Sequence, residues 1–105
     1  MKEGYVYLLC NPLEECYKIG VTTGTIEERM KKLQTGSSNE IHIVSYFKSA
    51  APFKLESLLH AKYSTKRKVG EWFELEPEQV FEFKKVCEEK EKTIESLKDN
   101  PWFWE

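Results

Sequence analysis

Residues 5–22, YVYLLCNPLEECYKIGVT, decide the fold. Tyr5 to Cys10 is a run of large aromatic and aliphatic residues, and Tyr17 to Thr22 alternates apolar residues with small or polar ones. The intervening Asn11 to Glu15 contains asparagine and proline, which favour turns. The stretch therefore predicts a β-hairpin, from which the rest of the chain can be placed.

A short helix is expected directly after the hairpin. Thr25 to Glu28 form a capping box, in which the threonine hydroxyl and the Glu28 side chain satisfy free amides at the helix start. Gly36 is the natural stop of this helix. Arg29 then lies one turn into it.

A third strand and a second helix follow. Residues 41–48 predict a strand with Ile43 and Ser45 on the same face and with both faces partly buried. Pro52 suits the first turn of a helix that runs to about Tyr63. Its apolar residues recur at helical spacing: Leu55, Leu58, Leu59 and Tyr63.

The last third of the chain predicts a basic turn at Lys66 to Lys68, a short strand at Trp72 to Leu75 and a long helix that starts at Pro77. This helix is expected to end near Asn100 and to leave an aromatic tail at Trp102 to Trp104. Its apolar stripe is Val80, Phe83, Val86, Cys87, Ile94 and Leu97.

The order β-β-α-β-α-β-α predicts an α+β fold with a small antiparallel or mixed sheet of three to four strands flanked by helices. Residues 1–76 are expected to form the functional module. Residues 77–105, the acidic helix and the aromatic tail, are expected to pack on the same domain.

Composition and length are those of one folded domain, with 105 residues, 40% hydrophobic and 32% charged. No stretch resembles a membrane span, and Met1 to Tyr7 contain no apolar run of signal-peptide length, so an intracellular protein with no membrane partner is expected. Cys10, Cys16 and Cys87 are expected as reduced thiols. A zinc site built on Cys10 and Cys16 with a histidine lacks a zinc-knuckle spacing.

Charge is unevenly distributed, although the net charge at pH 7 is only -2. Residues 16–69 carry ten Lys or Arg against four Glu, a net charge of +6, and residues 70–105 carry five Lys against eleven acidic residues, a net charge of -6. The middle segment is predicted to face phosphates, and the acidic segment to face solvent, a partner or the basic region.

Strand parity brings several polar residues of the hairpin together. If Val6 and Leu8 face the core, Tyr7 faces the other side of the sheet, because successive strand side chains alternate. On the second strand, Lys18 and Gly20 would then share the face of Tyr7, and the two helices are expected to bring Arg29 and Glu56 over that same face. Because Gly20 has no side chain, it would leave space for a ligand or a backbone to approach closely.

The chain resembles the GIY-YIG endonuclease superfamily over about residues 4–76. Members carry Gly-Ile-Tyr on the first strand and Tyr-Ile-Gly on the second, then a helix arginine and a later metal-binding helix glutamate. Here Tyr5-Val6-Tyr7 and Lys18-Ile19-Gly20 match the strand motifs, Arg29 the first helix and Glu56 the second. The ordered pattern looks like the compact branch common in phages, large DNA viruses and some cellular genomes. It consists of Tyr-Lys-Ile-Gly-x-Thr, then Arg, then Glu-x-x-x-His, then Gly-Glu-Trp-Phe at residues 70–73.

Two positions depart from the pattern of the superfamily. Lys18 stands where members more often have a tyrosine, while Tyr17 is one residue early and is expected to point inward. The late asparagine of many members has no clear counterpart around Trp72 to Glu76.

The resemblance implies a metal-dependent DNA endonuclease or nicking module that uses Mg²⁺ or Mn²⁺, with Glu56 as the metal ligand. Arg29 can hold two phosphate oxygens with its planar guanidinium. Tyr7 is the candidate base, although an unperturbed phenol has a pKa of about 10. A neighbouring Lys18 and a cation would favour the phenolate.

Other residues are expected near the site. His60 is a partner of Glu56, a phosphate contact or a buried histidine bonded to a backbone carbonyl, and a structural role near the site is favoured. Thr22 and Tyr17 are expected to support the site residues from behind. Trp72 and Phe73 are expected in the core and not as a base-stacking platform. Five basic residues are expected to contact DNA: Lys31, Lys32, Lys66, Arg67 and Lys68.

Two other functions stay open. One is a catalytically weak or inactive adaptor domain of the same fold that binds nucleic acid. The other is a protein-interaction module, or a homodimer, that works through the acidic helix and the tail from Trp102 to Trp104. A compact module without a separate reader domain has little surface for reading base edges, so low sequence specificity or structure-selective cutting is expected.

Overall fold

The computed structural model describes residues 3–97. Its elements, in chain order, are β1 (Gly4–Asn11), β2 (Cys16–Thr22), α1 (Ile26–Thr35), β3 (His42–Ser49), α2 (Pro52–Lys62), a 3-10 turn (Ser64–Lys66), β4 (Arg67–Val69), β5 (Trp72–Phe73), α3 (Pro77–Phe81) and α4 (Phe83–Leu97). The predicted α+β class is confirmed. The predicted tail at Trp102 to Trp104 lies outside the described residues.

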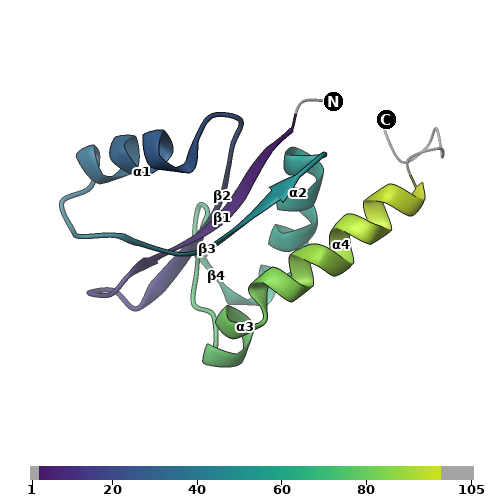
Figure 1. The fold of residues 1–105 in the computed structure, drawn as a ribbon. Helices are drawn as coiled ribbons and strands as arrows, with labels where there is room; N and C mark the ends of the chain where they lie inside the picture. The colour runs from purple at the N-terminus through teal and green to yellow at the C-terminus, as the bar shows by residue number, and fades with distance from the viewer. Residues whose placement is uncertain (1–2, 98–105) are drawn as a thin grey trace.

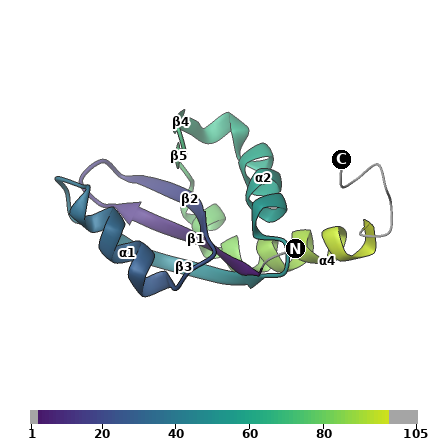
Figure 2. The same cartoon turned by 90° about the horizontal axis from the view of Figure 1, so that it is seen from above.

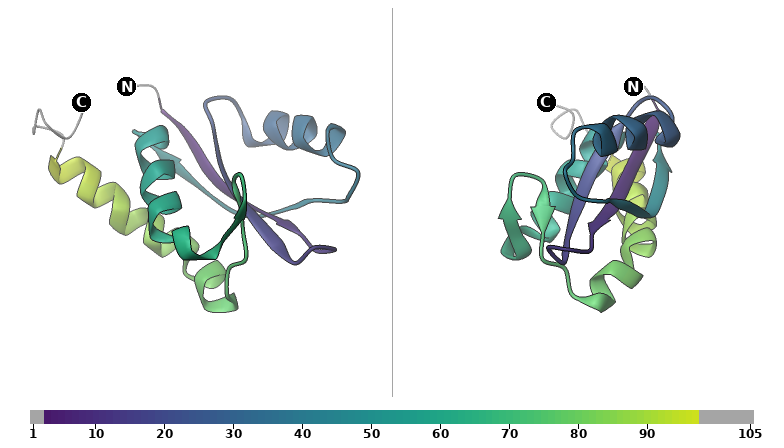
Figure 3. Two further views of the ribbon diagram at one scale, coloured as in Figure 1. Left: turned by 180° about the vertical axis from the view of Figure 1, so that it is seen from behind. Right: turned by 90° about the vertical axis from the view of Figure 1, so that its left-hand side faces the viewer.

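The sheet has five antiparallel strands in the order β3-β1-β2-β5-β4, with β4 and β5 on the side of β2 away from β3 (Figure 3). The prediction of three or four strands missed β4, because Arg67 and Lys68 were placed in a turn. The chain instead reverses at Gly70, whose φ of 55° lies in the left-handed region that glycine adopts without strain.

The predicted hairpin forms, and its register agrees with the predicted parity. Tyr7 lies opposite Gly20, and Leu9 lies opposite Lys18, so these four residues share one face of the sheet. In the turn, Asn11 Oδ1 accepts hydrogen bonds from the backbone amides of the second and third residues after it, at 3.2 and 3.4 Å. This side-chain-to-backbone pattern is the reason that asparagine favours turns.

The third strand differs from its prediction. Leu8 pairs with Ser45 and Leu9 with Ile43, so the register shifts by one residue at Val44. Ile43 and Ser45 therefore lie on different faces, not on the same one, because the extra residue reverses the alternation. The strand is also an edge strand whose first three residues are exposed, so its two faces are not both partly buried.

Helices cover both faces of the sheet (Figures 1 and 2), with α1 on one face and α2 and α4 on the other. The face under α2 and α4 holds the main core, which includes Val6, Leu8, Leu55, Leu59 and Phe83. The face under α1 holds a smaller cluster around Tyr7, Leu9 and Ile41. Tyr7 and Lys18 lie on this second face, and Arg29 lies on the helix that covers it.

The first two helices begin and end as predicted. Thr25 Oγ1 accepts a hydrogen bond from the backbone N–H of Glu28 at 3.1 Å, and Gly36 caps the other end of α1. The capping box predicts that the Glu28 side chain accepts from a backbone amide. In the structure it accepts instead from the Thr25 hydroxyl. Pro52 lies at the start of α2 and Tyr63 caps it.

The long helix predicted from Pro77 is interrupted. At Glu82 ψ is 1°, far from the helical value of about -42°, and this residue separates α3 from α4. The break leaves Phe81 93% exposed, whereas Phe83 is fully buried in the main core. A continuous apolar stripe could not reveal the break, because the stripe residues on both sides of it pack inward.

Candidate active site

The polar residues converge at the edge of β2, between α1 and α2. β5 pairs with β2 only at Tyr17 and Lys18, and the next residue, Ile19, donates its backbone N–H to the carbonyl of Glu71 at 3.2 Å. Beyond this point β5 leaves the edge of β2. Side chains from both helices reach the edge there.

Tyr7 and Arg29 form the part of the site that lies under α1. The Tyr7 hydroxyl is almost fully buried and accepts a hydrogen bond from Arg29 Nε at 3.2 Å. A Cβ atom added to Gly20 would clash with the hydroxyl and ring of Tyr7. The absence of a side chain at Gly20 therefore makes room for the Tyr7 ring itself.

Burial raises the pKa of the Tyr7 hydroxyl, and the nearby Arg29 opposes this only in part. The carboxylates of Glu71 and Glu56 raise the pKa further. The sequence-based expectation was that Lys18 would favour the phenolate. In the structure the Lys18 ammonium instead lies 3.6 Å from the Glu71 carboxylate. Tyr7 is therefore a neutral hydroxyl at neutral pH.

Glu56 reaches the same edge from the other side of the sheet. The prediction had both helices crossing one face, but Leu55 and Leu59 anchor α2 in the main core on the opposite face. The charges of Lys18 and Arg29 nevertheless reach the Glu56 carboxyl, where they oppose part of the rise in its pKa. The site thus lies at the border of β2, at a junction where side chains from the two faces of the sheet meet.

The Glu56 carboxyl has a pKa raised to about 7, first by burial and then by the neighbouring Glu71 carboxyl, through a hydrogen bond and through its charge. A hydrogen bond between two carboxyls requires that one of them be protonated. With both ionised, the buried Oε2 of Glu56 has no hydrogen-bond partner among residues 3–97. A bound cation would satisfy this oxygen.

Sequence reasoning missed Glu71. This residue lies at the β4–β5 turn, where its carbonyl holds Ile19 and its carboxylate pairs with Lys18. The only signal was its position in the segment Gly70-Glu71-Trp72-Phe73, next to two aromatic residues that were read as core. Its distance from Glu56 depends on the pairing of β5 with β2, which no local pattern reveals.

His60 lies one helical turn after Glu56, and its Nε2 is 2.9 Å from the carbonyl oxygen of Ile19. Because a carbonyl only accepts, this nitrogen carries a proton, and in the neutral ring the lone pair is on Nδ1. The ring also packs edge-on against Phe73, with 5.1 Å between the ring centroids. His60 thus ties α2 to β2 and β5, as expected for the favoured structural role.

The donor set fits a hard divalent cation. One potential ligand atom from each of Glu56, His60 and Glu71 lies within 4.8 Å of the other two. Carboxylate oxygens are the ligands that Mg²⁺ prefers, and a cation between the two carboxylates would remove their repulsion and satisfy Glu56 Oε2. Glu56 and Glu71 are the expected ligands, and the structure adds the second of them to the sequence-based prediction.

In a comparison with known families, residues 4–88 match the T5orf172 domain. The chain belongs to the T5orf172 domain family. This domain is found in phage and nuclease-like proteins and is associated with nuclease-like and DNA-binding functions. The match runs past residue 76 into α4. No curated protein and no solved structure matches the chain.

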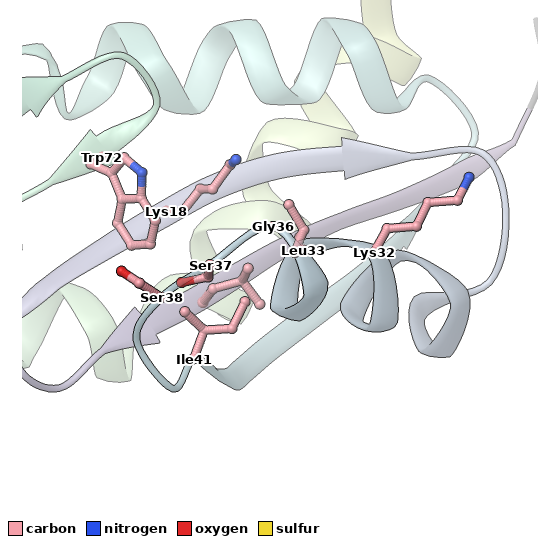
Figure 4. A pocket seen from close by; sticks show the side chains of 9 residues that line it. Lys18, Lys32, Leu33, Gly36, Ser37, Ser38, Ile41 and Trp72 are labelled. Carbon is pink, nitrogen blue, oxygen red and sulfur yellow. The ribbon is translucent and has the colours of Figure 1, made fainter.

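The other predicted site residues of this T5orf172 domain lie around the junction or away from it. Thr22 Oγ1 accepts a hydrogen bond from the Gly24 amide at 3.2 Å and so shapes the turn before α1. Tyr17 packs against the main core, as its parity predicted. Phe73 is fully buried, as predicted, but Trp72 is only partly buried and borders a groove (Figure 4).

The five basic residues predicted to contact DNA lie in two places. Lys31 and Lys32 are exposed on α1, and Lys68 is exposed on β4. Lys66 pairs with Glu76 at 3.1 Å, and Arg67 donates to the Gly70 carbonyl at 2.6 Å. The last two therefore hold the β4–β5 hairpin in place. Within residues 3–97, no helix of the T5orf172 domain is long and apolar enough to cross a membrane.

Proposed function

We propose that this T5orf172 domain is a metal-dependent DNA endonuclease or nicking module of the GIY-YIG type. The observation that carries the proposal is that four residues chosen from their order in the sequence meet at one edge of the sheet, although they come from four different elements: Tyr7, Lys18, Arg29 and Glu56. An exposed solvated face would not place a partly buried arginine against a buried tyrosine beside two carboxylates.

Glu56 and Glu71 would hold the cation, Mg²⁺ or Mn²⁺. When bound there, such an ion polarises a phosphoryl oxygen and acidifies a coordinated water. The carboxylate pair supports this role because it contains the buried oxygen without a partner and because Glu56 has a pKa raised to about 7 when no cation is present.

Arg29 would bind the scissile phosphate. Its Nε is used by the Tyr7 hydroxyl, which fixes the orientation of the guanidinium. The terminal amino groups then face two phosphate oxygens as a planar fork. Charge that builds up on these oxygens during the displacement is stabilised by a group that is already in position.

Tyr7 would hold Arg29 in position and donate a hydrogen bond. It would not act as the base. Its pKa is raised, so the hydroxyl keeps its proton at neutral pH. Because Arg29 already donates to the oxygen, the Tyr7 proton is directed at another acceptor, either the attacking water or a phosphate oxygen. Lys18 adds a positive charge next to Glu71 at the same edge.

A nicking assay tests the proposal. Purified protein is incubated with supercoiled plasmid and with branched DNA in the presence of Mg²⁺ or Mn²⁺, and Glu56→Gln is compared with wild type. We expect nicking by wild type and a loss of about 10²-fold or more in Glu56→Gln, since one electrostatic group in a catalytic site is worth this much. Glu89→Gln is the matched control, because Glu89 is exposed on α4.

Two results would contradict the proposal. One is that wild type cuts none of these substrates with either metal. The other is that Glu56→Gln cuts as fast as wild type. Salt-sensitive DNA binding that ignores both metal and Tyr7→Phe would instead assign the chain to the non-catalytic adaptor class.

A further inference from the structure

A groove of about 400 Å³ opens on the α1 face directly beside the proposed active site (Figure 4). Leu9 and Ile41 give the groove an apolar lining. Trp72 stands at one end near Ser37 and Ser38, and Leu33 lies toward the other. The volume is within the range of about 300–1,000 Å³ that is usual for small-molecule sites. The groove can therefore hold one planar ring with its polar substituents.

Trp72 gives this groove an aromatic wall. Its neighbour Phe73 points to the main core and is fully buried, whereas Trp72 is only partly buried and lines the groove. The Lys18 ammonium lies 6.0 Å from the centroid of the Trp72 ring. An indole held in this way offers a face on which an aromatic ligand can stack.

Lys18 connects the groove with the active site. Its side chain borders the groove next to Trp72, and its ammonium points toward α2 and lies 3.6 Å from the Glu71 carboxylate (Figure 4). The groove and the carboxylate pair thus share one residue. A ligand seated against Trp72 would therefore lie next to Lys18, whose ammonium also contacts the carboxylate pair.

We infer that the groove binds an unpaired nucleobase of the DNA strand whose phosphate lies in the active site. An apolar lining, an aromatic wall and the Ser38 hydroxyl suit a planar ring with polar edges. Lys18 and Lys32 supply the positive charge that the attached phosphates need. A base inside a duplex is stacked on both faces and cannot enter, so the inference selects bulges, mismatches and junctions as substrates.

The inference rests on the proposed function in taking DNA as the ligand, but its test does not require cutting. Binding is measured by fluorescence anisotropy in EDTA, where no divalent cation is free. Two labelled probes are compared: a fully paired duplex and the same duplex with one unpaired 2-aminopurine. We expect wild type to bind the second probe about tenfold more tightly, since one stacked base contributes about 1–3 kcal/mol. Quenching of the 2-aminopurine emission reports stacking on Trp72.

Three variants decide whether the groove is responsible. Trp72→Leu should reduce the tenfold preference to about twofold or less and abolish quenching, whereas Trp72→Phe should keep most of the preference. Ser38→Trp should block the groove from an exposed position without disturbing the core. Ser96→Trp on α4 is the matched control and should bind both probes like wild type.

Equal affinity of wild type for the two probes would overturn the inference, and so would a preference that survives both Trp72→Leu and Ser38→Trp. Free 2′-deoxyadenosine monophosphate separates the two sources of a nucleobase. If it displaces the probe at micromolar concentration, the groove is a site for free nucleotides and not for the DNA strand. Failure of the nicking assay with this preference intact would contradict the endonuclease proposal alone.

Discussion

Among residues 3–97, the face of the sheet under α2 and α4 has thirteen buried residues in its core cluster, and the face under α1 has three. α2 and α4 contribute their own buried side chains to the first face, whereas α1 buries none. The first face therefore carries most of the hydrophobic free energy of folding. The second is thin enough to leave Arg29, Lys18 and a groove open to a ligand.

The largest expected effect is a loss of stability on the face under α2 and α4. Phe83→Ala removes a fully buried ring from the main core and should lower the free energy of unfolding by about 3–5 kcal/mol. Met30→Ala, under α1, should cost only about 1 kcal/mol, because Met30 is partly buried against a small cluster. Urea denaturation measures both. Equal costs would show that the two faces stabilise the fold equally.

Tyr7→Phe tests the thin face by activity. The hydroxyl makes one hydrogen bond, to Arg29, so its loss should cost only about 1 kcal/mol of stability. Nicking should fall about 10²-fold, since the proton donor and the anchor of Arg29 are both lost. The assay is plasmid nicking at saturating Mg²⁺, and Tyr46→Phe, on exposed β3, is the control. An unchanged rate would remove Tyr7 from the mechanism.

Gly20→Ala tests the close approach inside the hairpin. The new Cβ would overlap the Tyr7 ring and hydroxyl, so we expect a loss of about 1–3 kcal/mol in stability and slower nicking. Gly24→Ala is the matched control, because a Cβ there meets nothing closer than 3.7 Å. Thermal unfolding of both variants gives the comparison. If Gly20→Ala is as stable and as active as Gly24→Ala, Tyr7 can move freely.

The carboxylate pair should make stability depend on pH. The folded pKa of Glu56, raised to about 7, lies above its ordinary value of 4.5. Its contribution is therefore complete below about pH 4.5 and is lost as the pH rises to about 7, by about 1–2 kcal/mol after allowance for partial exposure to solvent. Melting temperatures in EDTA should show this slope, and Glu56→Gln should flatten it. At pH 7, Mg²⁺ should restore the lost stability to wild type only.

The smallest expected effect concerns the basic residues. Lys68 is exposed, so Lys68→Ala should weaken DNA binding about equally for all sequences and reduce the salt slope by about 1. Lys66→Ala should instead loosen the β4–β5 hairpin, because Lys66 pairs with Glu76. Anisotropy titrations at several salt concentrations separate the two. A Lys68→Ala slope equal to that of wild type would exclude β4 from the DNA interface.

Much of the fold was predictable because its determinants are local. The β1–β2 hairpin is defined by alternation and a turn asparagine, α1 by a threonine cap and Gly36, and α2 by Pro52 and its apolar spacing. What failed depends on distant partners. β4 is three exposed residues that become a strand only through β5, and the register shift at Val44 is set by β1.

The candidate site, like the fold, was predictable where its determinants are local and not where they depend on distant strand pairing. Tyr7 and Gly20 face one another because hairpin parity is a local property. Glu71 could not be recognised among the eighteen acidic residues as a second candidate metal ligand, since its place beside Glu56 follows from the pairing of β5 with β2. Trp72 and Phe73 could not be told apart from the sequence, because only the fold shows that Phe73 faces the main core while Trp72, partly buried, packs against the smaller cluster and lines the groove.

The register shift between β1 and β3 also bears on self-association. β3 is the outer strand, and it exposes Ile43, Val44 and Tyr46. A flat, apolar outer strand is a template on which a second chain can add its own strand and start an aggregate. The extra residue at Val44 increases the local twist and interrupts the row of backbone groups that such an addition requires. This irregularity therefore makes the exposed apolar strand a poorer template for a second chain.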